Sequence, residues 1–235
     1  MKTPDNLPDN LPGRFHGFDS PASLSQALAQ HISRELADAS AERRASLAVS
    51  GGRTPIQLFE QLSPLPLSWQ QIDITLIDER CVPADHNDSN AGLVQRHLLQ
   101  QHAQQARFLP LYQQEESTEA LNQRLSQLHW PLDVAILGMG NDGHTASLFP
   151  AAAELEAGLD PTQSQFCLSL TPPSAPHRRL TLSRRAISAS KTLILHLQGD
   201  DKLATLEQAL AGDDIRAMPI RAFLALPQLH IYWCP

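Results

Sequence analysis

The sequence predicts an α/β fold with a mostly parallel, Rossmann-like central sheet and helices on both of its faces. Short apolar runs alternate with longer segments of helical periodicity along most of the 235 residues, which is the pattern of repeated strand–helix units. No shift in composition marks a linker, so we expect one α/β domain over residues 19–235. Residues 1–18 contain the repeat PDNLPDNLP and are expected to form an extended tail.

The elements follow from local patterns, taken from the amino end. A helix is predicted over residues 20–40, where apolar side chains at helical spacing follow a serine N-cap and a proline; these positions are Ser20, Pro21, Leu24, Leu28, Ile32 and Leu36. Apolar runs bounded by polar residues predict strands at 45–50, 72–78, 132–138, 179–183, 192–197 and 229–234. Helical spacing predicts helices at 54–62, 89–99, 120–128 and 200–210, and a short helix that begins at His144.

Composition and charge narrow the class of protein. The hydrophobic content of 42% is typical of a soluble globular protein, and the net charge of −7 argues against a nucleic-acid binder. The three cysteines are far apart and form no CxxC motif, which favours a reducing, cytoplasmic location. No apolar run approaches the roughly 18 residues of a membrane span, and the amino end lacks the apolar segment of a signal peptide. We expect a cytoplasmic monomer without membrane or nucleic-acid partners.

Three loops that directly follow predicted strands carry unusual residues. In open α/β sheets, ligands bind outside the carboxyl ends of the strands. The first loop, SGGRTP at residues 50–55, opens a helix; Gly51 and Gly52 allow close approach of the backbone, and Thr54 suits an N-cap. Free N–H groups at a helix start attract phosphate. A tight turn with nothing bound is an equal alternative for this loop taken alone.

The second loop begins with the triplet Asp78, Glu79 and Arg80. It is expected to place two carboxylates and a guanidinium at one rim of the sheet. Arg80 can bind a phosphate through two hydrogen bonds, and Asp78 can orient a sugar hydroxyl or a water molecule. On charge alone, a salt-bridged, solvent-exposed loop is the stronger interpretation; the neighbouring loops favour ligand binding.

The third loop, GMGNDGHTASLFP at residues 138–150, places Asp142 two residues before His144. A histidine at a helix start is disfavoured in its charged form, and neutral imidazole is what a general base requires. Asp142 can fix the tautomer of that imidazole. A structural histidine that caps a turn is the alternative, but the glycine-rich Asp-Gly-His sequence favours catalysis.

Other charged residues are less distinctive. Arg179 begins a predicted strand, and Lys202 lies in the first turn of a helix, where the helix dipole disfavours a positive charge. Arg43 and Arg44 are interpreted as solvent-exposed. The sequence has no HExxH metal motif and no GxSxG nucleophile motif. We therefore expect no metal site and, in a hydrolase, attack by an activated water molecule.

Together, the motifs SGGRTP, DERCVP, GMGNDGHTASLFP, RLTLS and GDDK, in this order and spacing, resemble those of the 6-phosphogluconolactonases over residues 20–235. The resemblance implies hydrolysis of 6-phosphoglucono-1,5-lactone to 6-phosphogluconate, the second step of the oxidative pentose phosphate pathway. It also implies a fold shared with the glucosamine-6-phosphate deaminases and no obligatory cofactor.

The resemblance and the residue chemistry together assign roles in the site. His144 is expected to deprotonate the water molecule, with Asp142 orienting it. By resemblance, Arg80 and Lys202 bind the 6-phosphate, with Arg179 as a third candidate, and residues 51–54 with Asp78 hold the lactone. Arg53 is a large cation where many relatives carry a small polar residue; it either adds to the phosphate site or points to solvent.

Three rival functions are less consistent with the sequence. The related deaminases carry a glutamate five residues after the histidine, and Phe149 occupies that position here; phenylalanine cannot transfer protons. A non-catalytic phosphosugar sensor would be expected to have lost His144 and Asp142, and both are present. A nucleotide-binding domain is the third rival; the GxxxxGK[ST] motif does not occur, and the one GxGxxG spacing, GMGNDG at residues 138–143, lies inside the Asp-Gly-His loop.

Overall fold

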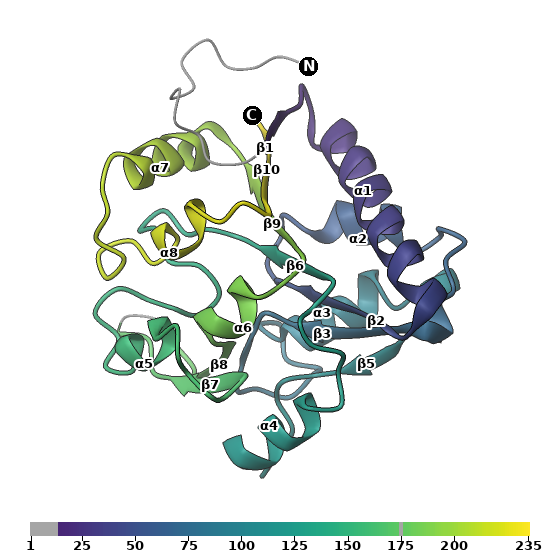
Figure 1. Cartoon of the computed structure of the whole chain (residues 1–235), viewed down its shortest axis with the longest axis horizontal. Helices are drawn as coiled ribbons and strands as arrows, with labels where there is room; N and C mark the ends of the chain where they lie inside the picture. Colours follow the sequence, from purple (N-terminus) through teal and green to yellow (C-terminus); the bar gives the residue numbers. More distant parts are fainter. Residues whose placement is uncertain (1–13, 174–175) are drawn as a thin grey trace.

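The computed structural model describes residues 14–173 and 176–235. Its main sheet contains seven strands, and every neighbouring pair in it is parallel. In spatial order these are β1 (Arg14–Gly17), β10 (Leu229–Cys234), β9 (Thr192–Gln198), β6 (Val134–Leu137), β2 (Ala45–Val49), β3 (Ile72–Leu76) and β5 (Arg107–Leu109). The predicted parallel α/β sheet is therefore confirmed, and Figure 1 shows it running through the molecule.

A second, antiparallel sheet contains three strands, which are β4 (Asp78–Arg80), β8 (Arg179–Leu182) and β7 (Cys167–Leu170). The predicted strand over 72–78 divides between the two sheets at Ile77. The Ile77 N–H donates to the Val49 carbonyl at 2.9 Å, and the Ile77 carbonyl accepts from the Leu182 N–H at 2.8 Å. The predicted strand at 179–183 belongs to this second sheet because it pairs with β4.

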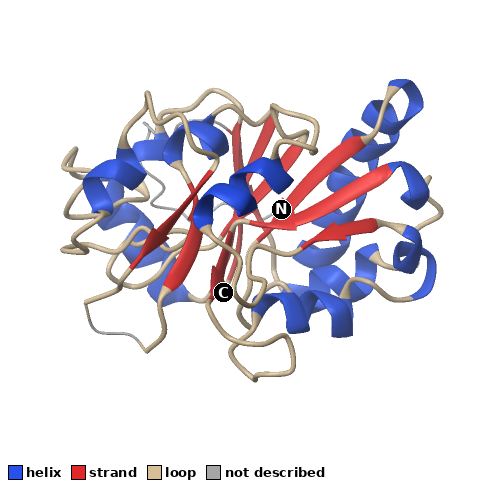
Figure 2. Cartoon of the chain, turned by 90° about the horizontal axis from the view of Figure 1, so that it is seen from below, coloured by secondary structure: helices blue, strands red, loops and turns tan. Residues whose placement is uncertain are grey.

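Helices cover both faces of the main sheet. Figure 1 shows α1 (Pro21–Glu42) and α2 (Ile56–Leu62) on one side, and α7 (Asp200–Leu210) and α8 (Arg221–Leu224) on the other. In Figure 2 the strands pass between the two groups of helices. The remaining helical segments are α3 (Asn90–His97), α4 (Thr118–Leu125), α5 (Leu155–Leu159), α6 (Arg184–Ser188) and the short 3₁₀ turns η1 (Trp69–Gln71) and η2 (Gln101–Gln105).

The first helix forms for the predicted reasons. Ser20 caps α1, because its hydroxyl accepts a hydrogen bond from the Ser23 N–H, and Pro21 is the first helical residue. The periodic apolar side chains are fully buried, namely Leu24, Leu28, Ile32 and Leu36. This stripe packs α1 against β2 and β10.

Two predicted boundaries differ from the structure. The expected tail over 1–18 ends earlier, because residues 14–17 form β1 and pair with β10; residues 1–13 lie outside the described part. Helix α2 begins at Ile56 after Pro55, with no side-chain cap, so Thr54 is not its N-cap. One hydrophobic cluster joins buried residues of both sheets, and a single domain over 19–235 stays a prediction. None of the helices within 14–173 and 176–235 has the length and apolarity needed to cross a membrane.

Candidate active site

A cavity of about 330 Å³ opens at the carboxyl ends of β9, β6 and β2. The chain runs from β2 to β3 and β5 on one side, and from β6 to β9 and β10 on the other. The loops after β2 and β6 therefore leave in opposite directions and open a crevice between them. This is the switch point at which open α/β sheets bind ligands.

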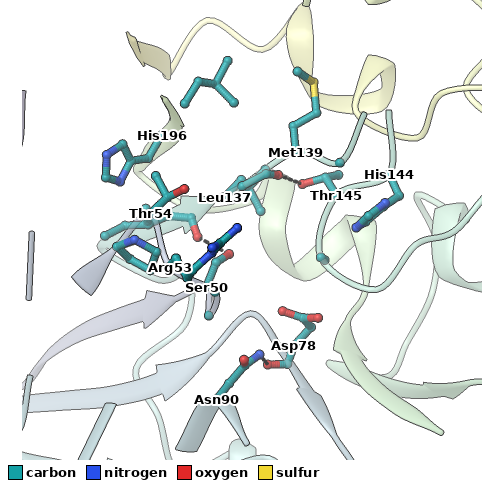
Figure 3. Close-up of a pocket in the computed structure, with 18 of the residues that line it drawn as sticks. Ser50, Arg53, Thr54, Asp78, Asn90, Leu137, Met139, His144, Thr145 and His196 are labelled. Carbon is teal, nitrogen blue, oxygen red and sulfur yellow. Dashed lines mark hydrogen bonds between the residues drawn. The ribbon is translucent and has the colours of Figure 1, made fainter. Parts of the chain in front are cut away.

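Most of the predicted site residues meet in this cavity (Figure 3). Those that line it are Gly51, Gly52, Arg53, Thr54, Asp78, Arg80, His144 and Lys202. Asp142 and Arg179 do not line the cavity themselves but contact residues that do. Asp142 contacts His144, and Arg179 lies beside Arg80. The three loops singled out in the sequence thus converge on one site, although they are far apart along the chain.

His144 and Asp142 form a tight pair. The imidazole Nδ1 lies 2.6 Å from Asp142 Oδ1, and the same oxygen accepts a hydrogen bond from the His144 backbone N–H at 3.1 Å. Burial alone would raise the pKa of Asp142, but the hydrogen bonds and charge of His144 outweigh it and hold that pKa below its ordinary value. An ionised Asp142 accepts a hydrogen bond from Nδ1–H, which leaves the lone pair on Nε2.

Gly140 makes room for this pair. A Cβ atom at position 140 would lie 2.2 Å from the His144 ring and 2.7 Å from Asp142 Oδ1, so a larger residue would displace both. On its other side, the His144 ring packs against Phe149, with 4.3 Å between the ring centroids. The imidazole is therefore held by a carboxylate, a glycine and an aromatic ring.

The predicted short helix at His144 is wrong. Residues 144–149 form turns, with Ala146 at φ 53° and a bridge between Thr145 and Leu148. Tertiary hydrogen bonds override the local helical spacing, because the Thr145 hydroxyl donates to the Gly138 carbonyl and the Ser147 hydroxyl donates to Asp78. The helix-dipole argument for a neutral His144 therefore does not apply.

Asp78 is anchored at one oxygen. The buried Ser147 hydroxyl donates to Asp78 Oδ2 at 2.6 Å, and Asn90 Nδ2 donates to the Asp78 carbonyl at 2.8 Å. The Asn90 amide also explains Gly51, since a Cβ there would lie 1.8 Å from Asn90 Oδ1. Asp78 lines the cavity, and no side chain of the described residues is hydrogen-bonded to its other carboxylate oxygen.

Glu79 does not reach the cavity, contrary to the sequence expectation for the Asp-Glu-Arg triplet. It is fully buried, and its carboxylate accepts hydrogen bonds from the N–H groups of Arg80, Asn90 and Ala91 at 2.7–2.8 Å. Burial raises its pKa above the ordinary value despite these bonds. Glu79 fastens the start of α3 to β4, which places Asn90.

Two arginines form the cationic wall. Arg80 on β4 and Arg179 on β8 are directly opposite each other, and the Nε atom of each is buried without a hydrogen-bond partner in the described chain. Burial, and then the charge of Arg80, lower the pKa of Arg179. Lys202 lies in the first turn of α7, and its ammonium group donates to Asn141 Oδ1. Arg53 lines the cavity with an exposed side chain.

Sequence patterns assign no role to three residues that the structure brings to the site. Asn90 is the first residue of α3, and Ser147 lies within the GMGNDGHTASLFP motif and contacts Asp78 across 69 residues of chain. His196 lines the cavity from within the apolar strand β9, where a histidine is usually part of the core. No local pattern distinguishes these three residues.

One group within the described residues has the composition of a metal site. Potential ligand atoms of His86, Asp88 and His177 lie within 4.8 Å of one another, on the two loops next to Arg80 and Arg179. The two histidines are 91 positions apart in the sequence, so spacing could not reveal them. None of the three lines the cavity.

Comparison with known proteins identifies one family. The family model for glucosamine-6-phosphate isomerases/6-phosphogluconolactonase matches residues 19–233. A 6-phosphogluconolactonase of Pseudomonas aeruginosa is 49% identical, over 92% of each chain. A crystal structure of a 6-phosphogluconolactonase from Shewanella baltica superposes with a TM-score of 0.91 at 45% identity, covering 95% of this chain and 98% of that chain.

A more distant structure extends the likeness of the fold. A monomeric glucosamine-6-phosphate deaminase superposes with a TM-score of 0.75 at 22% identity, over 94% of this chain and 97% of that chain. The fold is thus shared across lactonases and deaminases, while the higher identities are to lactonases. The chain belongs to the glucosamine-6-phosphate isomerase/6-phosphogluconolactonase family, and within it to the 6-phosphogluconolactonases, which are carboxylic ester hydrolases.

Proposed function

We propose that this chain hydrolyses 6-phospho-D-glucono-1,5-lactone to 6-phospho-D-gluconate with a water molecule activated by His144, as the second step of the oxidative pentose phosphate pathway. The observation that carries the proposal is the His144–Asp142 pair in a cavity that also contains the cations Arg80 and Lys202. A general base next to an anion site suits a phosphorylated ester. The names of the similar proteins support the same substrate.

The base acts through Nε2 of His144. Asp142 accepts a hydrogen bond from Nδ1–H and stays ionised, so Nε2 takes a proton from water as the oxygen attacks the lactone carbonyl carbon. The tetrahedral oxyanion then collapses, the bond from the carbonyl carbon to the ring oxygen breaks, and the imidazolium returns the proton to that oxygen. One water molecule is consumed, and His144 ends in its starting state. A lactone is an activated ester, so no covalent enzyme intermediate is needed.

The phosphate is proposed to bind between the cations. Arg80 and Lys202 line the cavity, and Arg179 supports Arg80 from the facing strand. Two guanidinium groups this close repel each other, and a dianionic phosphate relieves that repulsion. Arg53 adds a further cation at the rim. Binding energy from the phosphate, far from the reacting carbon, then positions the carbonyl for attack.

The sugar ring is proposed to lie between Asp78 and the loop of Gly51, Gly52 and Thr54. The free oxygen of Asp78 accepts a hydrogen bond from a ring hydroxyl, while Ser147 holds the other oxygen. Phe149 packs on His144, where the deaminases carry a proton-transferring glutamate. Because phenylalanine cannot transfer protons, Phe149 favours hydrolysis over deamination.

The proposal includes a cytoplasmic monomer that needs no cofactor. The three cysteines are free thiols, which suits a reducing compartment, and the chain's own residues make every proton transfer above. Sedimentation equilibrium tests the monomer. Dialysis against EDTA tests the cofactor statement, since the rate of a metal-independent reaction stays unchanged.

The test of the function generates the lactone in place from glucose 6-phosphate and its dehydrogenase, and follows 6-phosphogluconate at early times. Acceleration over spontaneous hydrolysis is the expected result. Unphosphorylated gluconolactone, as a matched substrate, should be hydrolysed much more slowly, because it lacks the phosphate. Release of ammonia from glucosamine 6-phosphate, without lactone hydrolysis, would contradict the proposal.

A further inference from the structure

His196 is a buried histidine on β9 that lines the cavity and has no role in the mechanism above. Its side chain is 6% exposed, and the residues on either side in the strand are leucines. The Nδ1 atom is buried and has no hydrogen-bond partner among the described residues. Figure 3 shows the His196 ring near Thr54, across the cavity from His144. A buried imidazole nitrogen without a hydrogen-bond partner lowers the stability of the folded protein. Its retention in an apolar strand therefore calls for a functional explanation, such as a hydrogen bond made by the other nitrogen.

The charge of His196 is set by this burial. Desolvation lowers its pKa to about 4, so the ring is neutral at the pH of the cytoplasm. A neutral imidazole carries one proton, on either Nδ1 or Nε2. The two tautomers differ in which nitrogen is a donor, and the surroundings decide between them.

The surroundings favour the proton on Nε2. A buried N–H without an acceptor is rarer in proteins than a buried acceptor without a donor, so the bare Nδ1 is the nitrogen without the proton. Nε2 is then the donor. Among the buried atoms without a partner only Nδ1 of this ring is found, and His196 lines the cavity, so we take Nε2 as the nitrogen with access to it. A neutral N–H donor aimed into a sugar site requires an oxygen atom as its acceptor.

We infer that His196 is a substrate-contacting residue whose Nε2–H donates a hydrogen bond to an oxygen of the phosphosugar, on the side of the cavity formed by Gln198 and Lys202. This inference rests on the proposed function, since the acceptor belongs to that substrate. His196 binds the substrate but takes no part in proton transfer, because it lies across the cavity from His144. Its loss therefore weakens binding and leaves the chemical step unchanged.

The kinetic test compares His196→Phe and His196→Gln with the wild type. Phenylalanine keeps the ring and removes the donor, whereas glutamine places an amide N–H near the position of Nε2. His196→Phe should raise KM for the lactone about 3- to 10-fold, as expected for one neutral hydrogen bond, with kcat unchanged. His196→Gln should restore most of the loss. An unchanged KM in His196→Phe overturns the inference.

Binding and stability separate this role from a structural one. The melting temperature of His196→Phe should not fall, because the change removes a buried nitrogen that has no partner. A lower melting temperature with an unchanged affinity for 6-phosphogluconate would make His196 structural. Calorimetry identifies the acceptor: weaker binding of both 6-phosphogluconate and inorganic phosphate assigns a phosphate oxygen. Weaker binding of 6-phosphogluconate alone assigns a sugar oxygen.

Two-bond ¹H–¹⁵N NMR spectra of the wild type test the tautomer without any variant. The Nε2–H form is expected in the free protein, and the Nε2 signal should shift when 6-phosphogluconate binds. A spectrum of the Nδ1–H form overturns the inference. A wild type that neither hydrolyses the lactone nor binds 6-phosphogluconate contradicts the proposed function as well. If the wild type is active and His196→Phe has the same KM, only the role of His196 is contradicted.

Discussion

Arg80 and Arg179 lie directly opposite each other in the second sheet, and the buried Nε atom of each has no partner within the described chain. The two positive charges repel each other, and this repulsion raises the free energy of the protein when no anion lies next to them. The antiparallel sheet of β4, β8 and β7 therefore makes a contact that the parallel sheet does not make. It brings Arg179 of β8 next to Arg80 of β4, the strand that follows β3.

Substitution of Arg80 should weaken substrate binding more than catalysis. Arg80→Ala removes a charge-assisted contact to the phosphate, so KM should rise about 10- to 100-fold, with a smaller effect on kcat. Steady-state kinetics with the lactone measures both constants. Arg96→Ala, at an exposed position of α3, is the matched control and should behave as wild type. A large loss of kcat at constant KM would place Arg80 in the chemical step instead.

A methyl group at position 140 should damage the catalytic pair. In Gly140→Ala the new Cβ would approach the His144 ring to 2.2 Å, so the ring must turn away from Asp142. We expect kcat to fall at least about 10-fold, through loss of base catalysis, while the circular dichroism spectrum stays that of the wild type. Gly138→Ala is the control in the same loop, because no atom lies within 4 Å of its added Cβ. Equal activity of the two variants would show that Gly140 does not position the pair.

The free energy of unfolding should depend on pH through His196. Its pKa is about 4 in the folded protein against an ordinary value of 6.5 for histidine, so below pH 6.5 the unfolded chain binds a proton that the folded chain does not. Stability is therefore full above pH 6.5 and falls as the pH drops towards 4, by up to about 3 kcal/mol. Urea unfolding of the wild type and His196→Phe at several pH values measures the difference. The variant should lose less stability on acidification; parallel curves would contradict the burial argument.

Asp133 should stabilise the protein without affecting the site. It is 3% exposed at the amino end of β6, where it accepts hydrogen bonds from Arg43 and the Ser46 N–H and pairs with Lys191. Asp133→Ala leaves Arg43 without its buried partner and should cost about 3 kcal/mol of stability. KM should not change, because the cavity lies at the other end of the strands. Asp38→Ala, at an exposed position of α1, is the control, and an equal loss in both variants would refute the buried pair.

The sequence was sufficient for the architecture because that depends on local patterns. Alternating apolar runs and helical stripes identified β2, β6, β9, β10, α1 and α7 close to their observed limits. β1 was missed because RFHG is short and follows a proline-rich repeat, and its pairing with β10 joins the two ends of the chain. The predicted helix at His144 is wrong for a similar reason, since side-chain hydrogen bonds to Gly138, seven residues away, and to the distant Asp78 decide the conformation there.

The candidate site was predictable where its residues lie in strand-end loops, and not where two distant segments meet. Asp142 and His144 are two residues apart, so their pairing could be expected. The sequence predicts solvent-exposed side chains for Arg43 and Arg44, yet they neutralise the buried Asp133 and Asp73, 90 and 29 residues away. A single sequence does not show which distant arginine pairs with an aspartate at the start of a strand. For His196 the sequence shows only a histidine in an apolar strand. The structure was needed to show that it lines the cavity and that its Nδ1 has no partner among the described residues.

The most direct test of the central claim, that His144 is the base, is kcat/KM of His144→Ala for the phosphorylated lactone between about pH 6 and 8. The proposed mechanism predicts a loss of about 10²–10⁴-fold at every pH. His97→Ala, a histidine of α3 that pairs with Glu60 outside the cavity, should retain wild-type activity. Near-normal kcat/KM in His144→Ala would contradict the claim and transfer the role to another group, with Asp78 the first to examine.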